Sequence, residues 1–195
     1  MSQHDKMRTM IPSNRQLPSG TPPEVRQLDV NDIPSLLNIQ SSVYPAGYHE
    51  PGSVFHNRLA LAKRYCHGIH GQLGHLGGYL IAHPWHPGHP SALMAHLDAL
   101  PDTPTHLHIH DLAVHPEQQG KQCAQRLLRH TLRLAIQAGL TTAGLVAGPG
   151  AANYWLAMGF KPARTIAPPL FPDNYGAEAV FLNASLALLQ DHFLP

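Results

Sequence analysis

The sequence predicts a single domain of the mixed α/β or α+β class. Its 195 residues suffice for one domain with a substantial core and fall short of two ordinary domains. Short apolar runs typical of strands alternate with runs whose apolar residues recur at helical spacing. The strongest helical run, residues 121–140, lies between two of the strand-like runs. We expect the domain to span residues 24–195 and to follow a polar, proline-bearing, flexible tail at residues 1–23.

The first half of the domain is predicted to run strand, helix, helix and paired strands. Residues 24–28 form a short strand-like run, and a helix is predicted to begin at Asn31. Residues 52–66 repeat the helical period. Residues 71–85 combine glycines with an apolar run typical of paired strands, so we expect a hairpin near residues 71–73.

The segment at residues 83–104 is predicted to be a functional loop or lid, because it contains five prolines and little strand pattern. Within it, residues 91–100 are expected to form a short helix. The stretch HPWHPGHP carries His83, His86 and His89. Its regular proline spacing favours a solvated, polyproline-like loop over a metal site.

The second half of the domain is predicted to alternate strands and helices. In order these are a strand at residues 105–115, a helix at 121–140, a strand at 141–147, a turn and short helix at 148–160, and a closing strand at 178–188. Gly139 and Gly159 are expected to end the two helices, since glycine readily adopts the left-handed conformation found at helix C-termini.

Composition excludes several classes of function. Lys and Arg number 13 against 12 Asp and Glu, without a basic cluster, so no nucleic-acid partner is expected. Cys66 and Cys123 are too few for a disulfide framework or a cysteine-based zinc module, which favours the cytosol. No apolar run reaches the about 18 residues of a membrane span, and no secretory signal is recognised. We therefore expect a cytoplasmic monomer or homodimer with no membrane partner.

The turn at residues 117–124 has features of an anion site. It joins a buried strand to a long helix, and helix N-termini present unpaired N–H groups at the positive end of the helix dipole. Gly120 and Ala124 leave room for a ligand to approach the backbone, and Lys121 adds positive charge. The patterns of the two common nucleotide-binding loops are both absent. An ordinary helix start remains the alternative.

Two segments resemble the GCN5-related N-acetyltransferases. The run LAVHPEQQGKQCAQRLL resembles that family's strand, pyrophosphate turn and helix, whose turn pattern is Q/R-x-x-G-x-G/A. Gln119 and Ala124 match this pattern, whereas Gln122 stands at a position where the family has glycine. The run NYWLAMGF is similar to the family's short helix ending in Gly-Phe. The resemblance implies a mostly antiparallel central sheet with a splayed parallel pair, flanked by helices, and acetyl-CoA as co-substrate.

The resemblance also implies which residues hold acetyl-CoA. The pantetheine arm would pair with the backbone of Leu112, Ala113 and Val114. The pyrophosphate turn would comprise Gln119, Gly120, Lys121, Gln122, Cys123 and Ala124. Trp155 stands where many members have a tyrosine that protonates the departing thiolate, and indole cannot act as that acid. Tyr154 is the adjacent alternative, although one helical residue turns a side chain by about 100° and rim packing is the competing interpretation.

The stretch HLHIHDLAVH is similar to a strand of the arylalkylamine branch of the family. This implies that His108 and His110 lie on a path that removes the proton of the substrate amine, whose pKa of about 10 keeps it protonated at neutral pH. Strand alternation places His106 on the same face and Asp111 on the other. The polar face of a half-buried strand is one alternative, and a metal site is another. No metal is predicted, because no other ligand stands at a typical spacing.

The acceptor site is predicted from aromatic residues. Trp85 would form an aromatic wall for an aryl amine, and Tyr44 and Tyr48 are further candidate contacts, although such residues are more often core. The predicted function is an acetyl-CoA-dependent N-acetyltransferase that acts on a small primary amine of the arylalkylamine or polyamine type. A non-catalytic acyl-CoA-binding or sensor domain and a histidine-rich metal-binding protein are the alternatives.

Overall fold

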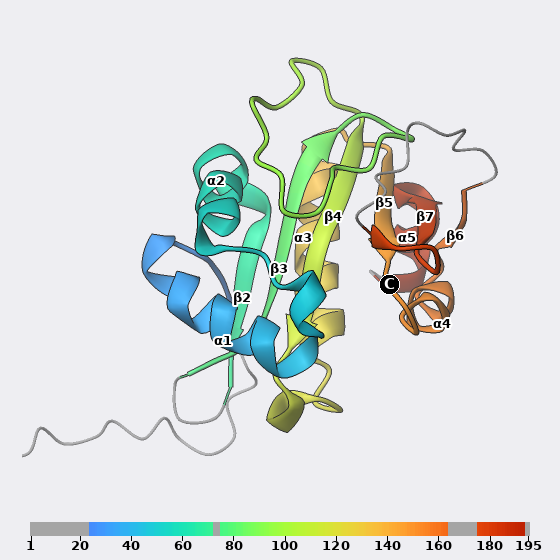
Figure 1. Ribbon diagram of the computed structural model, residues 1–195. Helices are drawn as coiled ribbons and strands as arrows, with labels where there is room; N and C mark the ends of the chain where they lie inside the picture. Colours follow the sequence, from blue (N-terminus) through green and yellow to red (C-terminus); the bar gives the residue numbers. More distant parts are fainter. Residues whose placement is uncertain (1–23, 72–74, 164–174, 194–195) are drawn as a thin grey trace, which may run out of the picture.

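The computed structural model describes residues 24–71, 75–163 and 175–193, and it places one central sheet between two layers of helices (Figure 1). Within these ranges the strands are β1 (Val25–Gln27), β2 (Cys66–His70), β3 (Leu76–Trp85), β4 (His106–Val114), β5 (Thr142–Ala147), β6 (Lys161–Pro162) and β7 (Val180–Ser185). The helices are α1 (Ile33–Val43), α2 (Gly52–Ala62), α3 (Cys123–Gln137), α4 (Ala152–Ala157) and α5 (Leu186–Phe193).

The sheet has the order β1-β2-β3-β4-β5-β7-β6 within the described residues. Neighbouring strands are antiparallel except for β4 and β5, which run parallel. The predicted mixed fold, with a mostly antiparallel sheet and one parallel pair, is confirmed. The antiparallel pairing of β2 with β3 also agrees with the predicted hairpin, although residues 72–74 of its turn lie outside the described residues, as does the predicted tail at 1–23.

Each face of the sheet is covered by its own helices (Figure 1). On one face α1 and α2 pack against β3, where Phe55 meets Tyr79 edge-on with ring centroids 5.8 Å apart. On the other face α3 presents an apolar stripe, including Leu127, Leu128 and Leu132, to β2, β3 and β4. Among the described helices none is long and apolar enough to cross a bilayer.

The parallel pair separates part of the way along its length. His106 pairs with Thr142, and the pairing continues to Ile109 with Leu145. Beyond these residues β4 runs on to Val114 and β5 to Ala147 without pairing with each other. The two strands therefore diverge at their C-terminal ends, and the edge of β4 that faces β5 is left without a strand partner among the described residues.

The structure corrects two expectations about the segment after β3. The strand extends through Trp85, so His83 lies inside the sheet and is fully buried rather than in a solvated loop. Residues 91–100 contain no helix. Met94 has a positive φ of 61°, and backbone groups of this loop bond to side chains elsewhere in the domain, since Met94 N donates to Glu50 and Leu97 N to Asn57.

The C-terminal end of the domain also differs from the prediction. The closing strand ends at Ser185, and residues that were expected to continue it form helix α5. The side chains of Leu186, Leu189 and Phe193 recur at helical spacing and are buried in the core that contains the apolar stripe of α3. Packing against α3 thus favours a helix over further strand.

The tight contact between β4 and β5 gives a stability prediction. A Cβ atom at Gly144 would lie 2.8 Å from His106 Nε2 and 3.2 Å from the carbonyl oxygen of Leu182. We expect Gly144→Ala to lower the free energy of unfolding by about 1–3 kcal/mol through overpacking, as measured by denaturant titration. Gly148→Ala is the control, because a Cβ there meets no atom within 4 Å. Equal effects of the two substitutions would contradict the packing.

Candidate functional site

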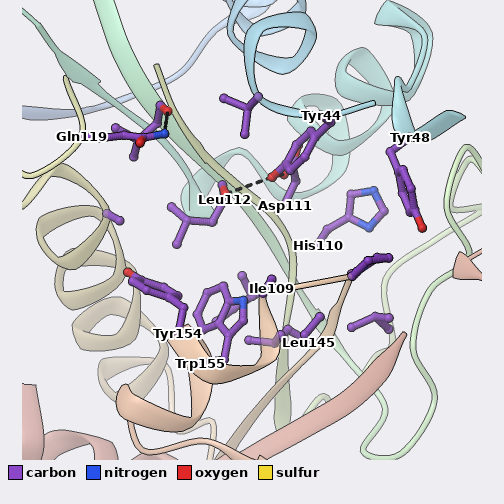
Figure 2. A pocket seen from close by; sticks show the side chains of 18 of the residues that line it. Tyr44, Tyr48, Ile109, His110, Asp111, Leu112, Gln119, Leu145, Tyr154 and Trp155 are labelled. Atoms are coloured by element: carbon purple, nitrogen blue, oxygen red, sulfur yellow. Dashed lines mark hydrogen bonds between the residues drawn. The ribbon is translucent and has the colours of Figure 1, made fainter. Parts of the chain in front are cut away.

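A cavity of about 880 Å³ lies where β4 and β5 diverge. Ile109 and Leu145 form the last paired position between the two strands. Both line the cavity, together with Tyr154 and Trp155 of α4 (Figure 2). The cavity continues from this junction to the N-terminus of α3 in one direction and to the segment after α1 in the other. The divergence of the two strands therefore creates one continuous space with two different ends.

The open edge of β4 borders the cavity. Leu112 and Val114 line it, whereas Ala113 points into the core under α1 and α2 and is 1% exposed. An exposed strand edge presents unpaired N–H and C=O groups, which an extended ligand can pair with in the manner of an added strand. Of the three residues predicted to form this edge, two contribute side chains to the cavity.

The turn before α3 forms one end of the cavity. Five of its six predicted residues line the cavity, namely Gln119, Gly120, Gln122, Cys123 and Ala124. Lys121 does not, and its ammonium group instead lies 3.2 Å from the side-chain oxygen of Gln118. A Cβ atom at Gly120 would meet no atom within 4 Å, so the backbone here is open to a ligand.

The start of α3 is suited to bind an anion. Gln122 occupies the N-cap position with φ 61° and ψ 16°, and its side chain caps no backbone N–H. The first N–H groups of this 15-residue helix thus lack a side-chain cap and stand beside the cavity at the positive end of the helix dipole. Gln122 stands where the family pattern has glycine, and it adopts the left-handed conformation at a cost of about 1 kcal/mol for a non-glycine residue.

Tyr154 and Trp155 both line the middle of the cavity (Figure 2). Trp155 is 8% exposed and packs edge-on against Phe160, with ring centroids 5.3 Å apart. Tyr154 is 39% exposed, packs edge-on against Trp155, and its partial burial raises the pKa of its hydroxyl above 10. One residue along a helix turns the side chain by about 100°, yet Tyr154 still lines the cavity beside Trp155.

The other end of the cavity contains a buried contact between a carboxylate and an imidazole that sequence reasoning missed. Glu50 Oε2 lies 2.8 Å from His110 Nε2, and both residues line the cavity. On the far side of the imidazole, Ser91 Oγ lies 3.2 Å from His110 Nδ1. Glu50 and Ser91 belong to irregular segments without a recognisable motif, so only the folded chain brings this carboxylate, imidazole and hydroxyl into one row.

Glu50 is charged at neutral pH despite its burial. Burial alone raises the pKa of its carboxyl group, but His110, the backbone N–H of Met94 and the nearby Arg58 outweigh this effect and lower the pKa overall. The N–H of Met94 donates to Glu50 Oε1 over 2.6 Å. The cavity therefore carries a fixed negative charge at this end.

A β-bulge at His110 corrects the expected orientation of Asp111. In the pairing of β3 with β4, Ile81 faces Asp111 and Ala82 faces Ile109, so His110 is an extra residue. Alternation is broken there, and Asp111 lies on the same face as His110 rather than the opposite one. Its carboxylate accepts hydrogen bonds from Tyr44 over 2.7 Å and from Tyr79 over 2.6 Å. Burial raises the pKa of Asp111, and these hydrogen bonds oppose it only in part.

His108 is not one of the described residues that line the cavity. It is 1% exposed, and neither of its ring nitrogens has a hydrogen-bond partner. Burial lowers its pKa well below 6.5, and the neighbouring His83, His110 and His106 and the Arg58 guanidinium lower it further. Of the two histidines predicted to form a proton path, the structure brings only His110 to the cavity.

Tyrosines surround the Glu50 end of the cavity. Tyr44 and Tyr48, both predicted as acceptor contacts, line this end. Tyr175, which sequence reasoning missed, lines it too, and its hydroxyl donates to the Ser91 carbonyl over 2.9 Å. Trp85 is absent from the described lining residues and instead stacks edge-on on His83, with ring centroids 5.1 Å apart. No lysine or arginine is among the described residues that line the cavity, so this end is aromatic and anionic.

Comparisons with known proteins agree with this geometry. Residues 33–160 match the sequence profile of the acetyltransferase (GNAT) family. No curated protein sequence matches the chain.

Solved structures with low sequence identity share the fold. The loading GNATL domain of CurA from Lyngbya majuscula has a TM-score of 0.69 at 11% identity, covering 85% of this chain and 98% of that chain. The ribosomal-protein-S18-alanine N-acetyltransferase from Escherichia coli has a TM-score of 0.60 at 18% identity, covering 84% and 94%. Naa50 from Arabidopsis thaliana, in complex with a bisubstrate analogue, has a TM-score of 0.61 at 13% identity, covering 85% and 99%.

The conformation of Gln122 gives a second stability prediction. Replacing Gln122 with glycine removes the strain of a left-handed non-glycine residue, so we expect the free energy of unfolding to rise by up to about 1 kcal/mol. The matched control is Gln125→Gly in the first turn of α3, which should lower that free energy by about 1 kcal/mol. Denaturant titration measures both. A loss of stability in Gln122→Gly similar to that of the control would contradict the assigned backbone conformation.

Proposed function

The chain belongs to the acetyltransferase (GNAT) family, and on this premise we propose that it transfers an acetyl group from acetyl-CoA to the primary amine of a small molecule. Family membership makes the chain an acyltransferase with acetyl-CoA as co-substrate. We assign the acceptor to the arylalkylamine or polyamine type. The observation that carries this proposal is that one cavity joins an uncapped helix N-terminus to an anionic, tyrosine-lined end.

The residues around the α3 end fit acetyl-CoA. The uncapped N-terminus of α3 and the open backbone at Gly120 would bind the pyrophosphate, and the unpaired edge at Leu112 and Val114 would bind the extended pantetheine arm. Bound acetyl-CoA supplies a thioester whose thiol has a pKa of about 8.5 once released. Trp155 would pack beside the arm at the point where β4 and β5 separate.

The opposite end of the cavity suits an amine. A primary ammonium group with a pKa of about 10 arrives protonated, and the fixed charge of Glu50 attracts it while the rings of Tyr44, Tyr48 and Tyr175 enclose its apolar part. The amine must lose a proton before it can attack a thioester. We assign the acceptor of that proton to the Glu50–His110 pair, because Asp111 is already engaged by two tyrosine hydroxyls.

The departing thiolate needs a proton or a hydrogen bond. Tyr154 is the candidate donor, because it lines the cavity beside Trp155, is partly exposed and has a raised pKa that keeps its hydroxyl protonated at neutral pH. Trp155 can donate a hydrogen bond through its indole N–H but cannot release that proton. Tyr154 therefore takes the role that the family assigns to a tyrosine at the neighbouring position.

Calorimetry with acetyl-CoA tests the co-substrate assignment. We expect stoichiometric binding with a dissociation constant in the range typical of enzyme substrates, about 1 μM to 1 mM. Lack of binding at millimolar acetyl-CoA would contradict both the cavity assignment and the enzyme. Binding without turnover of any amine would favour the sensor alternative instead.

Replacing Glu50 tests the acceptor end. We expect Glu50→Gln to lower kcat/KM for amine acetylation by about 10²–10⁴-fold, because it removes the charge that attracts the ammonium group and the partner of His110. The control is Glu24→Gln, since Glu24 is an exposed carboxylate outside the described cavity lining. An unchanged rate in Glu50→Gln would contradict the assignment.

The choice of acceptor needs its own assay. One structural neighbour is named a ribosomal-protein-S18-alanine N-acetyltransferase, and another is in complex with the bisubstrate analogue CoA-Ac-MVNAL. The assay should therefore compare arylalkylamines and polyamines with short peptides that carry a free N-terminus. We expect turnover of the small amines to exceed that of the peptides. The reverse order would reject the small-molecule assignment and retain the acetyltransferase.

A further inference from the structure

Three buried histidines converge behind the cavity, between the sheet and the layer of α1 and α2. His83 of β3 is the direct cross-strand partner of His108 of β4, and His110, two residues further along β4, lies on the same side as His108. Their ring centroids lie 5.2 Å apart for His83 and His108, and 6.1 Å apart for His108 and His110. One ring nitrogen from each residue lies within 4.8 Å of the other two. Two rigid neighbouring strands thus hold three potential ligand atoms together.

The hydrogen bonds of His83 and His110 share a pattern. In each ring one nitrogen lies next to an oxygen acceptor. His110 Nε2 lies 2.8 Å from Glu50 Oε2, and His83 Nδ1 lies 3.4 Å from the Pro84 carbonyl oxygen. The other nitrogen of each ring faces Ser91 Oγ, at 3.2 Å for His110 Nδ1 and 3.4 Å for His83 Nε2. Metal-binding histidines characteristically donate their second N–H to a carboxylate or carbonyl in this way, which orients the ligand nitrogen.

His108 supplies an independent observation. It is 1% exposed and both of its ring nitrogens lack partners, which is rare for a buried polar side chain. Burial lowers the pKa of His83 and of His108 well below 6.5, so both rings are neutral at physiological pH and keep the lone pair that binds a metal. The charged groups nearby are the Glu50 carboxylate, which favours a cation, and the Arg58 guanidinium, which opposes one.

We propose that His83, His108 and His110 bind one Zn²⁺ ion, with the Ser91 hydroxyl or a water molecule as the fourth ligand. Three imidazoles and one oxygen form a common tetrahedral set for zinc, with Zn–N distances of about 2.0–2.1 Å. Nitrogen ligands of such an ion stand about 3.4 Å apart, so the rings need to move inward by no more than about 1 Å each. The sequence did not bring these three residues together, because His83 was expected in a solvated loop apart from the histidines of β4.

This inference goes beyond the proposed acetyl transfer and is tested without it. Because His110 also belongs to the proposed catalytic pair, metal binding is measured on protein without acetyl-CoA or amine. A protein that binds no zinc then leaves the acetyltransferase proposal unchanged, and a protein without acetyltransferase activity leaves the metal-site proposal unchanged.

The test uses the untagged full-length chain after removal of metal with a chelator. Titration with Zn²⁺, gel filtration and elemental analysis should give one equivalent of zinc per chain, and titration with Co²⁺ should give the intense visible absorption bands of tetrahedral coordination. His83→Gln and His108→Gln should each lose this equivalent and these bands. His67→Gln is the matched control, because His67 is a buried histidine on the opposite face of the sheet, packed against His130 and Thr131 of α3.

Three results would overturn the metal site. The first is the absence of stoichiometric zinc in the wild-type protein at micromolar Zn²⁺. The second is retention of the bound ion by both His83→Gln and His108→Gln, which would place it on other histidines. The third is the weak absorption of octahedral Co²⁺ in the wild-type protein, a measurement that needs no variant to fold.

Discussion

After Ile109 and Leu145, strands β4 and β5 diverge, and the candidate site is built around the space that opens between them. A parallel pair that stays paired buries its backbone groups, whereas one that separates leaves an edge that needs a partner. The same divergence places the uncapped N-terminus of α3 and the rings of α4 around a single cavity. An anion site, an extended binding edge and an acceptor pocket thus share one structural cause.

A second feature is the polar layer buried between the sheet and helices α1 and α2. It contains Glu50, Arg58, His83, His108 and Asp111, all of which are buried or partly buried beside apolar core. Burying such groups is costly unless they are paired, and the bulge at His110 is what allows two consecutive polar residues of β4 to find partners on one face. This layer supplies the charge at the acceptor end and the histidines behind it.

Sequence reasoning recovered the parts of the site that are local in the chain. The strand, turn and helix at residues 105–140 are contiguous, and helix-start physics and family resemblance both describe them. The misplaced residues depend on tertiary contacts. The bulge reversed the side on which Asp111 lies, and the extension of β3 buried His83 and kept Trp85 away from the cavity. Glu50, Ser91 and Tyr175 lie outside the strands and α-helices, at positions that no spacing rule predicts.

Amide hydrogen exchange reports whether the open edge of β4 binds an extended ligand. Exchange of the backbone amides at residues 110–114 should be measured with and without acetyl-CoA. If the pantetheine arm pairs with this edge, acetyl-CoA should slow exchange there while leaving the paired amides of β2 unchanged. Unchanged exchange at residues 110–114 in the presence of saturating acetyl-CoA would contradict binding of the arm at this edge.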